Sequence, residues 1–201
     1  MIVLPFHQKD DLAAAVHQVQ RCLADSGVVL LPTETFYGLG CDPWSEVAVH
    51  KVLDLKDRPR DMPLPVLAAD WAQVDRLTVV PEIWRRRLGS RWPGPITAVL
   101  PLRQSLPLSV ADTVAVRIPA HGLLRQLLSE IGPLTGTSAN RHGDPPAIDV
   151  AAALHSLVGD PDLVLDGGPV AGGRPSTLVD LTGAKARILR QGAEIWGQSD
   201  G

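Results

Sequence analysis

The residues that could do chemistry in this sequence gather in three short stretches, each of which follows an apolar run. The stretches are residues 32–40, 56–63 and 135–140. They combine hydroxyl side chains, glycines and basic groups. Small residues after a strand let the backbone approach a ligand closely, so the pattern indicates ligand binding. An ordinary loop is the alternative interpretation of the first stretch.

The second stretch carries positive charge. Lys56 and Arg58 alternate with aspartates, and Pro59 and Pro63 stiffen the chain around them. Arginine offers phosphate a planar fork and lysine offers a point charge, so a polyanion is the expected ligand. A solvated surface loop is the alternative.

The third stretch and one isolated arginine also suggest anion binding. The hydroxyl and backbone N–H groups of residues 135–140 could form an anion-binding concavity, although a plain turn is the alternative. Arg117 stands near the end of an apolar run over residues 114–118. A buried guanidinium needs an anionic partner, which could be a ligand or an internal Asp or Glu.

Several common sites are absent from the sequence. It contains no phosphate-binding P-loop, no H-E-x-x-H zinc helix and no G-x-S-x-G nucleophile elbow. Gly38 and Gly40 begin like a dinucleotide fingerprint, but Pro43 stands where the third glycine belongs. Cys22 and Cys41 lack metal-ligand spacing, and we expect both to be reduced.

Length and composition indicate one globular domain over residues 1–201. Hydrophobic residues make up 45% of the chain and charged residues 20%, which is enough to bury a core. Glycine and proline each occur 18 times, which favours many turns over a helical bundle. The net charge of −3 excludes a generally basic nucleic-acid coat, though not a local basic cleft. No apolar run approaches 18 residues and no targeting signal is recognisable, so we expect a cytoplasmic protein without a membrane segment.

Apolar periodicity predicts helices alternating with strands. The predicted helices span residues 12–23, 45–56, 81–91, 121–131 and 150–158. The predicted strands span residues 28–31, 64–68, 96–100, 114–118, 134–137, 163–165, 177–181 and 188–189. The alternation favours an α/β fold with a mixed sheet. Within the third helix, we expect Arg85, Arg86 and Arg87 to form a solvated face.

Seven stretches, taken in order, resemble the motifs of the threonylcarbamoyl-AMP synthase family, which has a YrdC-like domain. The matching stretches are residues 32–42, 55–59, 91–97, 116–119, 137–140, 175–180 and 189–192. Each motif is weak alone, but the series is specific and covers about residues 10–193. The resemblance implies a twisted, mixed open sheet with surrounding helices and a large, positively lined cavity. The chain resembles the short bacterial type, which lacks an additional C-terminal domain.

The resemblance also implies a nucleotidyltransferase reaction. L-threonine, bicarbonate and ATP would give threonylcarbamoyl-adenylate, pyrophosphate and water, and the product would serve threonylcarbamoyladenosine modification of tRNA. Mg²⁺ would travel with ATP, because no carboxylate cage is evident in the sequence. The threonylcarbamoyl-transferase machinery and tRNA are the expected partners.

The family's functional residues can be carried over position by position. Lys56, Arg58 and Arg117 would be the catalytic residues. The threonine site would comprise Thr33, Thr35, Arg117, Gly136, Thr137 and Ser176. The nucleotide site would comprise Lys56, Arg58, Met62, Thr113, Ser138, Asn140, Pro146 and Arg190. Met62 and Leu67 stand where many relatives have polar side chains, so only backbone contacts are expected from these two positions.

Two other functions compete with this interpretation. One is a module that binds double-stranded RNA or tRNA in the basic cavity, with an affinity that falls steeply with salt. The other is a related carbamoyl-transfer protein that acts on a different substrate. Threonine-dependent release of pyrophosphate from ATP distinguishes both from the synthase. In the synthase, the glycine-rich residues 167–175 would form a mobile cover over the cavity.

Overall fold

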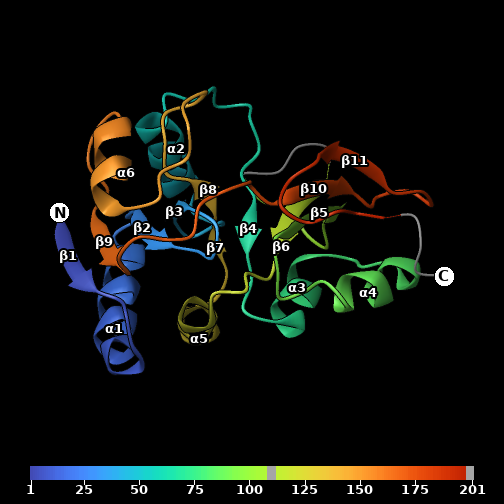
Figure 1. Ribbon diagram of the computed structural model, residues 1–201, viewed down its shortest axis with the longest axis horizontal. Coiled ribbons are helices and arrows are strands. Elements are labelled where there is room, and N and C mark those ends of the chain that lie inside the picture. The colour runs from blue at the N-terminus through green and yellow to red at the C-terminus, as the bar shows by residue number, and fades with distance from the viewer. Residues whose placement is uncertain (108–111, 198–201) are drawn as a thin grey trace.

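Two mixed β-sheets lie side by side in the structure (Figure 1). It is a computed structural model, and it describes residues 1–107 and 112–197. The first sheet has the strand order β1-β9-β2-β3-β8. These strands are β1 (Ile2–Pro5), β9 (Leu163–Asp166), β2 (Val29–Pro32), β3 (Tyr37–Gly40) and β8 (Thr137–Ser138). Strand β9 lies between β1 and β2 and is parallel to both, whereas β3 is antiparallel to β2 and β8.

The second sheet has the strand order β11-β10-β5-β6-β4-β7. These strands are β11 (Arg187–Arg190), β10 (Thr177–Asp180), β5 (Ile96–Pro101), β6 (Thr113–Arg117), β4 (Val66–Leu67) and β7 (Leu134–Thr135). Two of the pairs, β10 with β5 and β4 with β6, are parallel, and the other three are antiparallel. The predicted mixed α/β fold is therefore confirmed, with its strands divided between two sheets.

A single residue, Gly136, separates β7 from β8 and carries the chain from one sheet to the other. The Thr135 N–H donates to the Cys41 carbonyl oxygen at 2.9 Å, so the end of β7 also bonds to the first sheet. A Cβ atom on Gly136 would lie 2.3 Å from Cγ of Leu67. Only glycine fits this junction, which explains why the predicted strand over residues 134–137 is two short strands.

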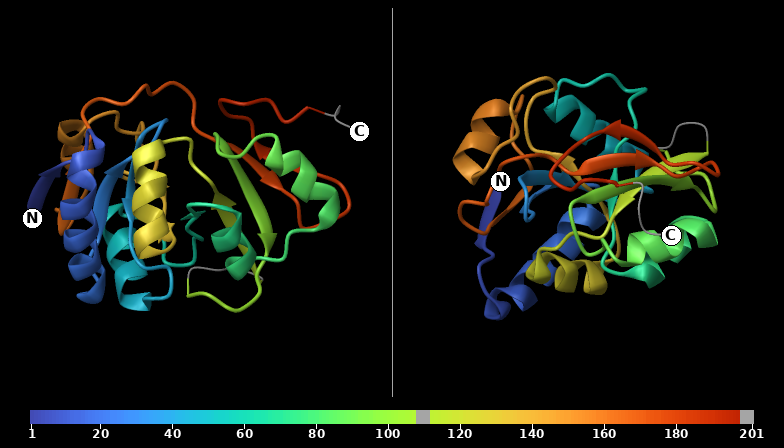
Figure 2. Two further views of the ribbon diagram at one scale, coloured as in Figure 1. Left: turned by 90° about the horizontal axis from the view of Figure 1, so that it is seen from below. Right: turned by 45° about the vertical axis from the view of Figure 1, so that its right-hand side comes forward.

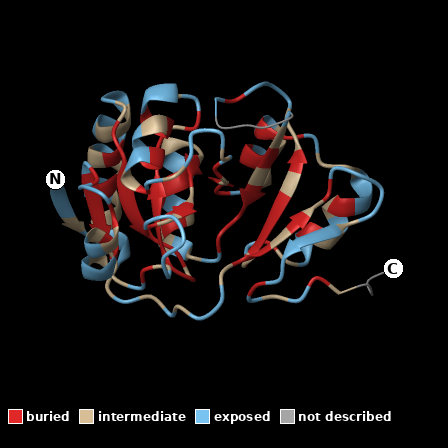
Figure 3. Ribbon diagram, turned by 90° about the horizontal axis from the view of Figure 1, so that it is seen from above, coloured by how far each residue is buried: buried red, intermediate tan, exposed pale blue. Residues whose placement is uncertain are grey.

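Helices cover both sheets (Figures 1 and 2). They are α1 (Leu12–Ala24), α2 (Glu46–Leu55), α3 (Trp71–Leu77), α4 (Glu82–Gly89), α5 (Gly122–Ile131) and α6 (Val150–Ser156), with a short 3₁₀ turn over Lys9–Asp11. In Figure 1, α1 and α5 lie below the first sheet, α2 and α6 lie above it, and α3 and α4 lie below the second. Burial follows this arrangement, because buried residues concentrate in the strands and on the inner helix faces (Figure 3).

Some local expectations hold and others do not. Ser45 caps α2, as a serine at the start of the predicted helix suggests. Its hydroxyl accepts the Ala48 N–H. Strand β3 falls inside the stretch that the sequence indicated as a loop. Its Gly38 and Gly40 backbones press against neighbours, since an added Cβ would lie 3.2 Å from the Thr137 carbonyl and 2.9 Å from Leu31 respectively.

The arginine run on α4 is a second correction. The Arg85 guanidinium lies over the ring of Trp71, 4.9 Å from its centroid, and pairs with Asp75. Arg87 lies over the rings of Trp84 and Trp196. Cation–π contact holds these two side chains against the molecule, so only Arg86 of the three is exposed to solvent.

Candidate active site

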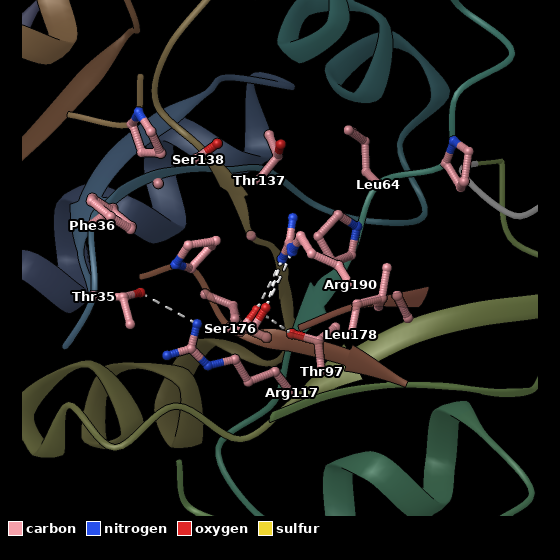
Figure 4. A pocket seen from close by; sticks show the side chains of 18 of the residues that line it. Thr35, Phe36, Leu64, Thr97, Arg117, Thr137, Ser138, Ser176, Leu178 and Arg190 are labelled. Carbon is pink, nitrogen blue, oxygen red and sulfur yellow. Dashed lines mark hydrogen bonds between the residues drawn. The ribbon is translucent and has the colours of Figure 1, made fainter. Parts of the chain in front are cut away.

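A cavity of about 750 Å³ opens where the two sheets meet. Its lining comes from the loop after β2, from β8, and from the strands of the second sheet (Figure 4). The cationic side chains that line it are Lys56, Arg58, Arg117, Arg187 and Arg190. The lining carboxylates are Asp144 and Asp180, so positive charge is in excess. Such a cavity suits anionic ligands.

The cavity brings together nearly all of the predicted site residues. Those that line it are Thr33, Thr35, Lys56, Arg58, Thr113, Arg117, Gly136, Thr137, Ser138, Asn140, Pro146, Ser176 and Arg190. Met62 is not among the lining residues. Its assignment to the nucleotide site came from motif position alone, whereas Pro63, the next residue of the same loop, does line the cavity.

Thr33 and Thr35 shape the rim beside the first sheet. The Thr33 hydroxyl donates to the Phe36 carbonyl at 2.7 Å and accepts the N–H groups of Thr35 and Phe36, both at 3.2 Å. The side chain of Thr33 therefore ties the turn together. The Thr35 hydroxyl lies 3.5 Å from Nη1 of Arg117, as the dashed line in Figure 4 shows.

Arg117 is buried at the end of β6, where the sequence predicted a guanidinium in need of an anion. Its Nε donates to the Gly94 carbonyl at 3.1 Å, and its Nη2 donates to the carboxylate of Glu34. The internal carboxylate that the sequence left open as a partner is therefore Glu34. Nη1 faces Thr35, on the cavity side.

Arg190 and Ser176 meet on the same wall as Arg117, the wall that the second sheet forms. Arg190 Nη2 donates to the Ser176 carbonyl at 2.9 Å and to the Ser176 hydroxyl at 3.3 Å. That hydroxyl also lies 2.8 Å from the hydroxyl of Thr97 on β5. Partial burial and the positive charge of Arg117 lower the pKa of Arg190, so the two guanidinium groups are close enough to repel one another.

Lys56 ends α2 and points into the protein. Its ammonium donates to the backbone carbonyls of Ser138 and Asn140, the latter at 2.6 Å. Burial and the neighbouring charge of Arg58 lower the pKa of Lys56 to about 8. Lys56 thus positions the loop after β8 as well as lending its charge to the cavity.

Arg58 and Asn140 each keep one polar atom without a partner. Arg58 donates from Nη2 to the Pro63 carbonyl at 2.9 Å, but its buried Nε has no hydrogen-bond partner in the described chain. The Asn140 amide nitrogen donates to the Arg141 and Asp144 carbonyls, at 2.7 and 2.8 Å, which leaves its buried Oδ1 unbonded among the described residues. Buried polar atoms in native proteins are nearly always satisfied, so both atoms are suited to a ligand.

Sequence reasoning missed several parts of the lining. They are Phe36, Leu64, Thr97, His142, Asp144, Leu178, Asp180 and Arg187. A polar residue within an apolar strand was the available signal for Thr97, since Ile96 and Ala98 beside it are fully buried. The apolar members carry no chemical signature, and only the tertiary structure places them in the wall.

The connection from β9 to β10, residues 167–176, runs from the first sheet to the second (Figure 2). It is anchored at its start, where the Tyr37 hydroxyl donates to the Gly168 carbonyl at 2.8 Å and accepts the Gly167 N–H at 3.0 Å. Burial raises the pKa of Tyr37 to about 12, so the hydroxyl keeps its proton at neutral pH. Further along, the Gly172 N–H donates to the Thr35 carbonyl at 2.9 Å.

Two features are not found among the described residues. Among residues 1–107 and 112–197, no group of three or more His, Cys, Asp or Glu side chains could hold a metal ion. Within the same residues, no helix is long and apolar enough to cross a membrane.

Fold and site together define an α/β protein whose two sheets enclose a cationic cavity for ligands that carry carboxylate or phosphate groups. The chain belongs to the Sua5/YciO/YrdC family. The family model Sua5_yciO_yrdC, described as "Telomere recombination", matches residues 21–192. The predicted family is thereby confirmed.

Relatives at about 40% identity have an activity in their names. The chain is 41% identical over 181 residues to a threonylcarbamoyl-AMP synthase of Pseudomonas putida (strain W619), a match that covers 88% of this chain and 97% of the relative. It is 42% identical over 166 residues to the threonylcarbamoyl-AMP synthase of Pseudomonas aeruginosa (strain UCBPP-PA14), with 80% of this chain and 89% of that one covered.

Solved structures share the fold. Crystalline P. abyssi Sua5 complexed with L-threonine matches with a TM-score of 0.86 and 31% identity over 96% of this chain. This chain spans 58% of that longer protein. E. coli YciO matches with a TM-score of 0.82 over 95% of this chain and 94% of its own, and its 21% identity shows the fold alone.

Proposed function

We propose that this chain is a threonylcarbamoyl-AMP synthase, a nucleotidyltransferase that converts L-threonine, bicarbonate and ATP into threonylcarbamoyl-adenylate, pyrophosphate and water. One observation carries the proposal. A single cavity holds a buried guanidinium suited to a carboxylate, that of Arg117, together with further basic and hydroxyl groups suited to phosphates. The names of the curated relatives support the same activity.

The amino acid binds beside Arg117 in this proposal. Its carboxylate accepts from the Nη edge of Arg117, and Thr35 and Ser176 frame its amine and hydroxyl. Gly136 leaves room at the junction of the sheets, because a larger residue would collide with Leu67. The remaining predicted members, Thr33 and Thr137, support the walls of the same pocket.

The nucleotide binds in the same cavity, next to the amino acid, in this proposal. Its phosphates lie against Arg58 and Arg190, where Nε of Arg58 has a free donor among the described residues. Lys56 adds positive charge and holds the Ser138 and Asn140 backbone in place. Thr113 and Pro146 lie along the same cavity.

The reaction needs two steps. The threonine amine attacks the carbon of bicarbonate to form a carbamate, and water leaves with the displaced oxygen. A carbamate oxygen then attacks the α-phosphorus of ATP, and the bond from that phosphorus to the bridging oxygen breaks to release pyrophosphate. Both steps crowd negative charge together, so fixed cations and oriented N–H groups are the main contribution of the protein.

Mg²⁺ enters with ATP as part of the substrate in this proposal. The described residues offer no cluster of carboxylates for a resident metal. Phosphate oxygens and water are the ligands that Mg²⁺ ordinarily keeps in such sites.

The product is an activated carbamate, so its consumer is an enzyme that transfers the threonylcarbamoyl group to adenosine in tRNA. We place this reaction in the cytoplasm, alongside that transferase machinery. Neither RNA binding as the main function nor a different carbamoyl substrate is favoured by a specific observation in the cavity.

The test is pyrophosphate release from ATP by the purified protein with bicarbonate and threonine, each omitted in turn. We expect release only when all three are present, together with an adenylate product detected by mass spectrometry. Release that is independent of threonine, or RNA binding without release, would contradict the proposal.

A further inference from the structure

Glu34 lies directly behind Arg117, in the loop that joins β2 to β3. Its Oε1 accepts from Nη2 of Arg117 and from the backbone N–H of Ala120 at 3.0 Å. The side chain of Arg117 is 7% exposed and that of Glu34 is 22% exposed. Arg117 lines the cavity, whereas Glu34 does not. The carboxylate therefore contacts the guanidinium from the protein side.

The atoms of Arg117 divide into two edges. Nε and Nη2 form one edge of a guanidinium, and on Arg117 this edge bonds to the Gly94 carbonyl and to Glu34. Nη1 and the second N–H of Nη2 form the other edge, for which the one contact among the described residues is the 3.5 Å contact of Nη1 with the Thr35 hydroxyl. In Figure 4 this group points toward Thr35 at the cavity. A carboxylate ligand needs two parallel N–H donors from one edge, and this second edge provides them.

We propose that Glu34 is a positioning residue, which holds Arg117 so that the free edge of its guanidinium faces the carboxylate of the amino acid substrate. The inference rests on the proposed function, because it deepens the role of the same site. Glu34 does not touch the substrate in this account. It acts through the orientation of Arg117.

The charges around Arg117 explain why a positioning residue is needed. Arg117 is buried close to Arg190, and the two cations repel. A buried charge without its partner is strongly unfavourable, so Arg117 would turn away from this place if Glu34 were absent. Gly94 alone supplies one neutral acceptor, which cannot fix both the position and the tilt of a planar group. Glu34, Gly94 and Thr35 together fix all three nitrogens of its end group.

The competing idea is that Glu34 imitates the substrate carboxylate and blocks the site. Its removal would then strengthen threonine binding. The two ideas predict opposite changes in the KM for threonine, so a pair of variants decides between them.

The experiment compares Glu34→Ala and Glu34→Gln with the wild type. We expect Glu34→Ala to raise the KM for threonine by roughly 10- to 100-fold while the KM for ATP changes less than about 3-fold. Glu34→Gln keeps the shape and one acceptor oxygen, so it should restore most of the threonine affinity. Asp75→Ala removes the carboxylate of the Arg85–Asp75 pair outside the cavity and should leave both KM values unchanged.

Crystal structures of Glu34→Ala and the wild type supply a readout that needs no catalysis. We expect Arg117 to leave the Gly94 carbonyl or the Thr35 hydroxyl in the variant, with the fold intact. An unmoved Arg117, a lower KM for threonine, or an equal rise in both KM values would overturn the positioning role. An inactive wild type would refute the synthase function, and the orientation of Arg117 in the two crystal structures would still decide the role of Glu34.

Discussion

The ammonium of Lys56 donates to the carbonyl oxygen of Asn140, a residue 84 positions later in the chain, at 2.6 Å. It donates to the Ser138 carbonyl as well. A lysine at the end of α2 therefore fixes the loop that follows β8. The same side chain holds this loop in place and supplies positive charge to the cavity. Mutation can separate these two contributions.

Lys56→Met removes the ammonium and keeps most of the length of the side chain. Two buried carbonyls then lose a donor, so we expect the free energy of unfolding to fall by about 1–3 kcal/mol. Affinity for a non-hydrolysable ATP analogue should fall in parallel. Arg58→Ala is the matched comparison. Arg58 donates to the Pro63 carbonyl at 2.9 Å and to the Thr137 hydroxyl at 3.4 Å, so its loss should cost nucleotide affinity with a smaller loss of stability. Chemical unfolding and calorimetric titration measure both effects, and unchanged stability of Lys56→Met would contradict the anchoring role.

ATP affinity should also depend on pH through Lys56. The pKa of this residue is lowered to about 8, so its side chain is charged below that pH and neutral above it. Loss of the charge weakens attraction for phosphate, and we expect affinity to fall by about 10-fold between pH 7.5 and 9.5. Lys56→Met is the control, because any pH dependence of affinity that remains in this variant comes from groups other than Lys56, including the nucleotide. An identical pH profile in the variant and the wild type would show that Lys56 does not titrate in this range.

Arg117→Ala tests the carboxylate site. A charge-assisted bidentate contact in a partly dry cavity contributes about 2–4 kcal/mol, so the KM for threonine should rise by roughly 30- to 1000-fold. ATP affinity should change much less. Steady-state kinetics with each substrate varied in turn provides the measurement. Unchanged threonine kinetics would leave Arg117 as the structural partner of Glu34 only.

Gly172→Ala tests the connection between β9 and β10. Gly172 has a φ of +68°, and an added Cβ would lie 2.9 Å from Ile148. Strain of about 1–3 kcal/mol should displace the segment and weaken the Gly172–Thr35 bond, which raises the KM for threonine. Gly183→Ala is the control, because a Cβ there meets nothing within 4 Å. Hydrogen exchange over residues 167–175 with and without substrates tests the predicted cover, and equal exchange together with normal turnover would rule it out.

Gly136→Ala should destabilise the junction of the sheets. The new Cβ would overlap Leu67, which is itself buried, and overpacking of this kind costs about 1–3 kcal/mol. A second change, Leu67→Ala, makes room and should recover part of the lost thermal stability. Gly89→Ala, at the end of α4 with open space around it, should be neutral. A double variant as unstable as the sum of its parts would show that Leu67 is not the obstacle.

The sequence predicted well those features that local pattern determines. Helix α5 followed from leucines at helical spacing, and Leu124, Leu127 and Leu128 are indeed its buried face. Order and type of motif likewise pointed to the cavity, because nearly all of the predicted site residues line it. Strand β3 escaped because its glycines have low strand propensity, and its pairing with β2 and β8 is decided by close backbone contact.

Contacts between residues far apart in the chain could not be predicted from the sequence. Arg87 is covered by Trp196, and nothing near either residue in the sequence indicates that contact. Glu34 as the partner of Arg117 was one of many possible carboxylates until the fold brought the two together. Met62 lies outside the cavity lining, and the backbone contact predicted for it from motif position stays a prediction.

The place of β9 between β1 and β2 has a consequence for how this protein is made. Of the described strands, β1 is produced first and pairs with β9 alone, in a register that joins Ile2 to Leu163. Strand β10, which joins β5 to β11, follows later still. Neither sheet can therefore be complete until the ribosome has synthesised β9 for the first sheet and β11 for the second. The site needs Ser176 and Arg190, so it forms after most of the chain has been synthesised. Pairings so distant in sequence close slowly, so we expect both sheets to be completed late in the folding of this domain.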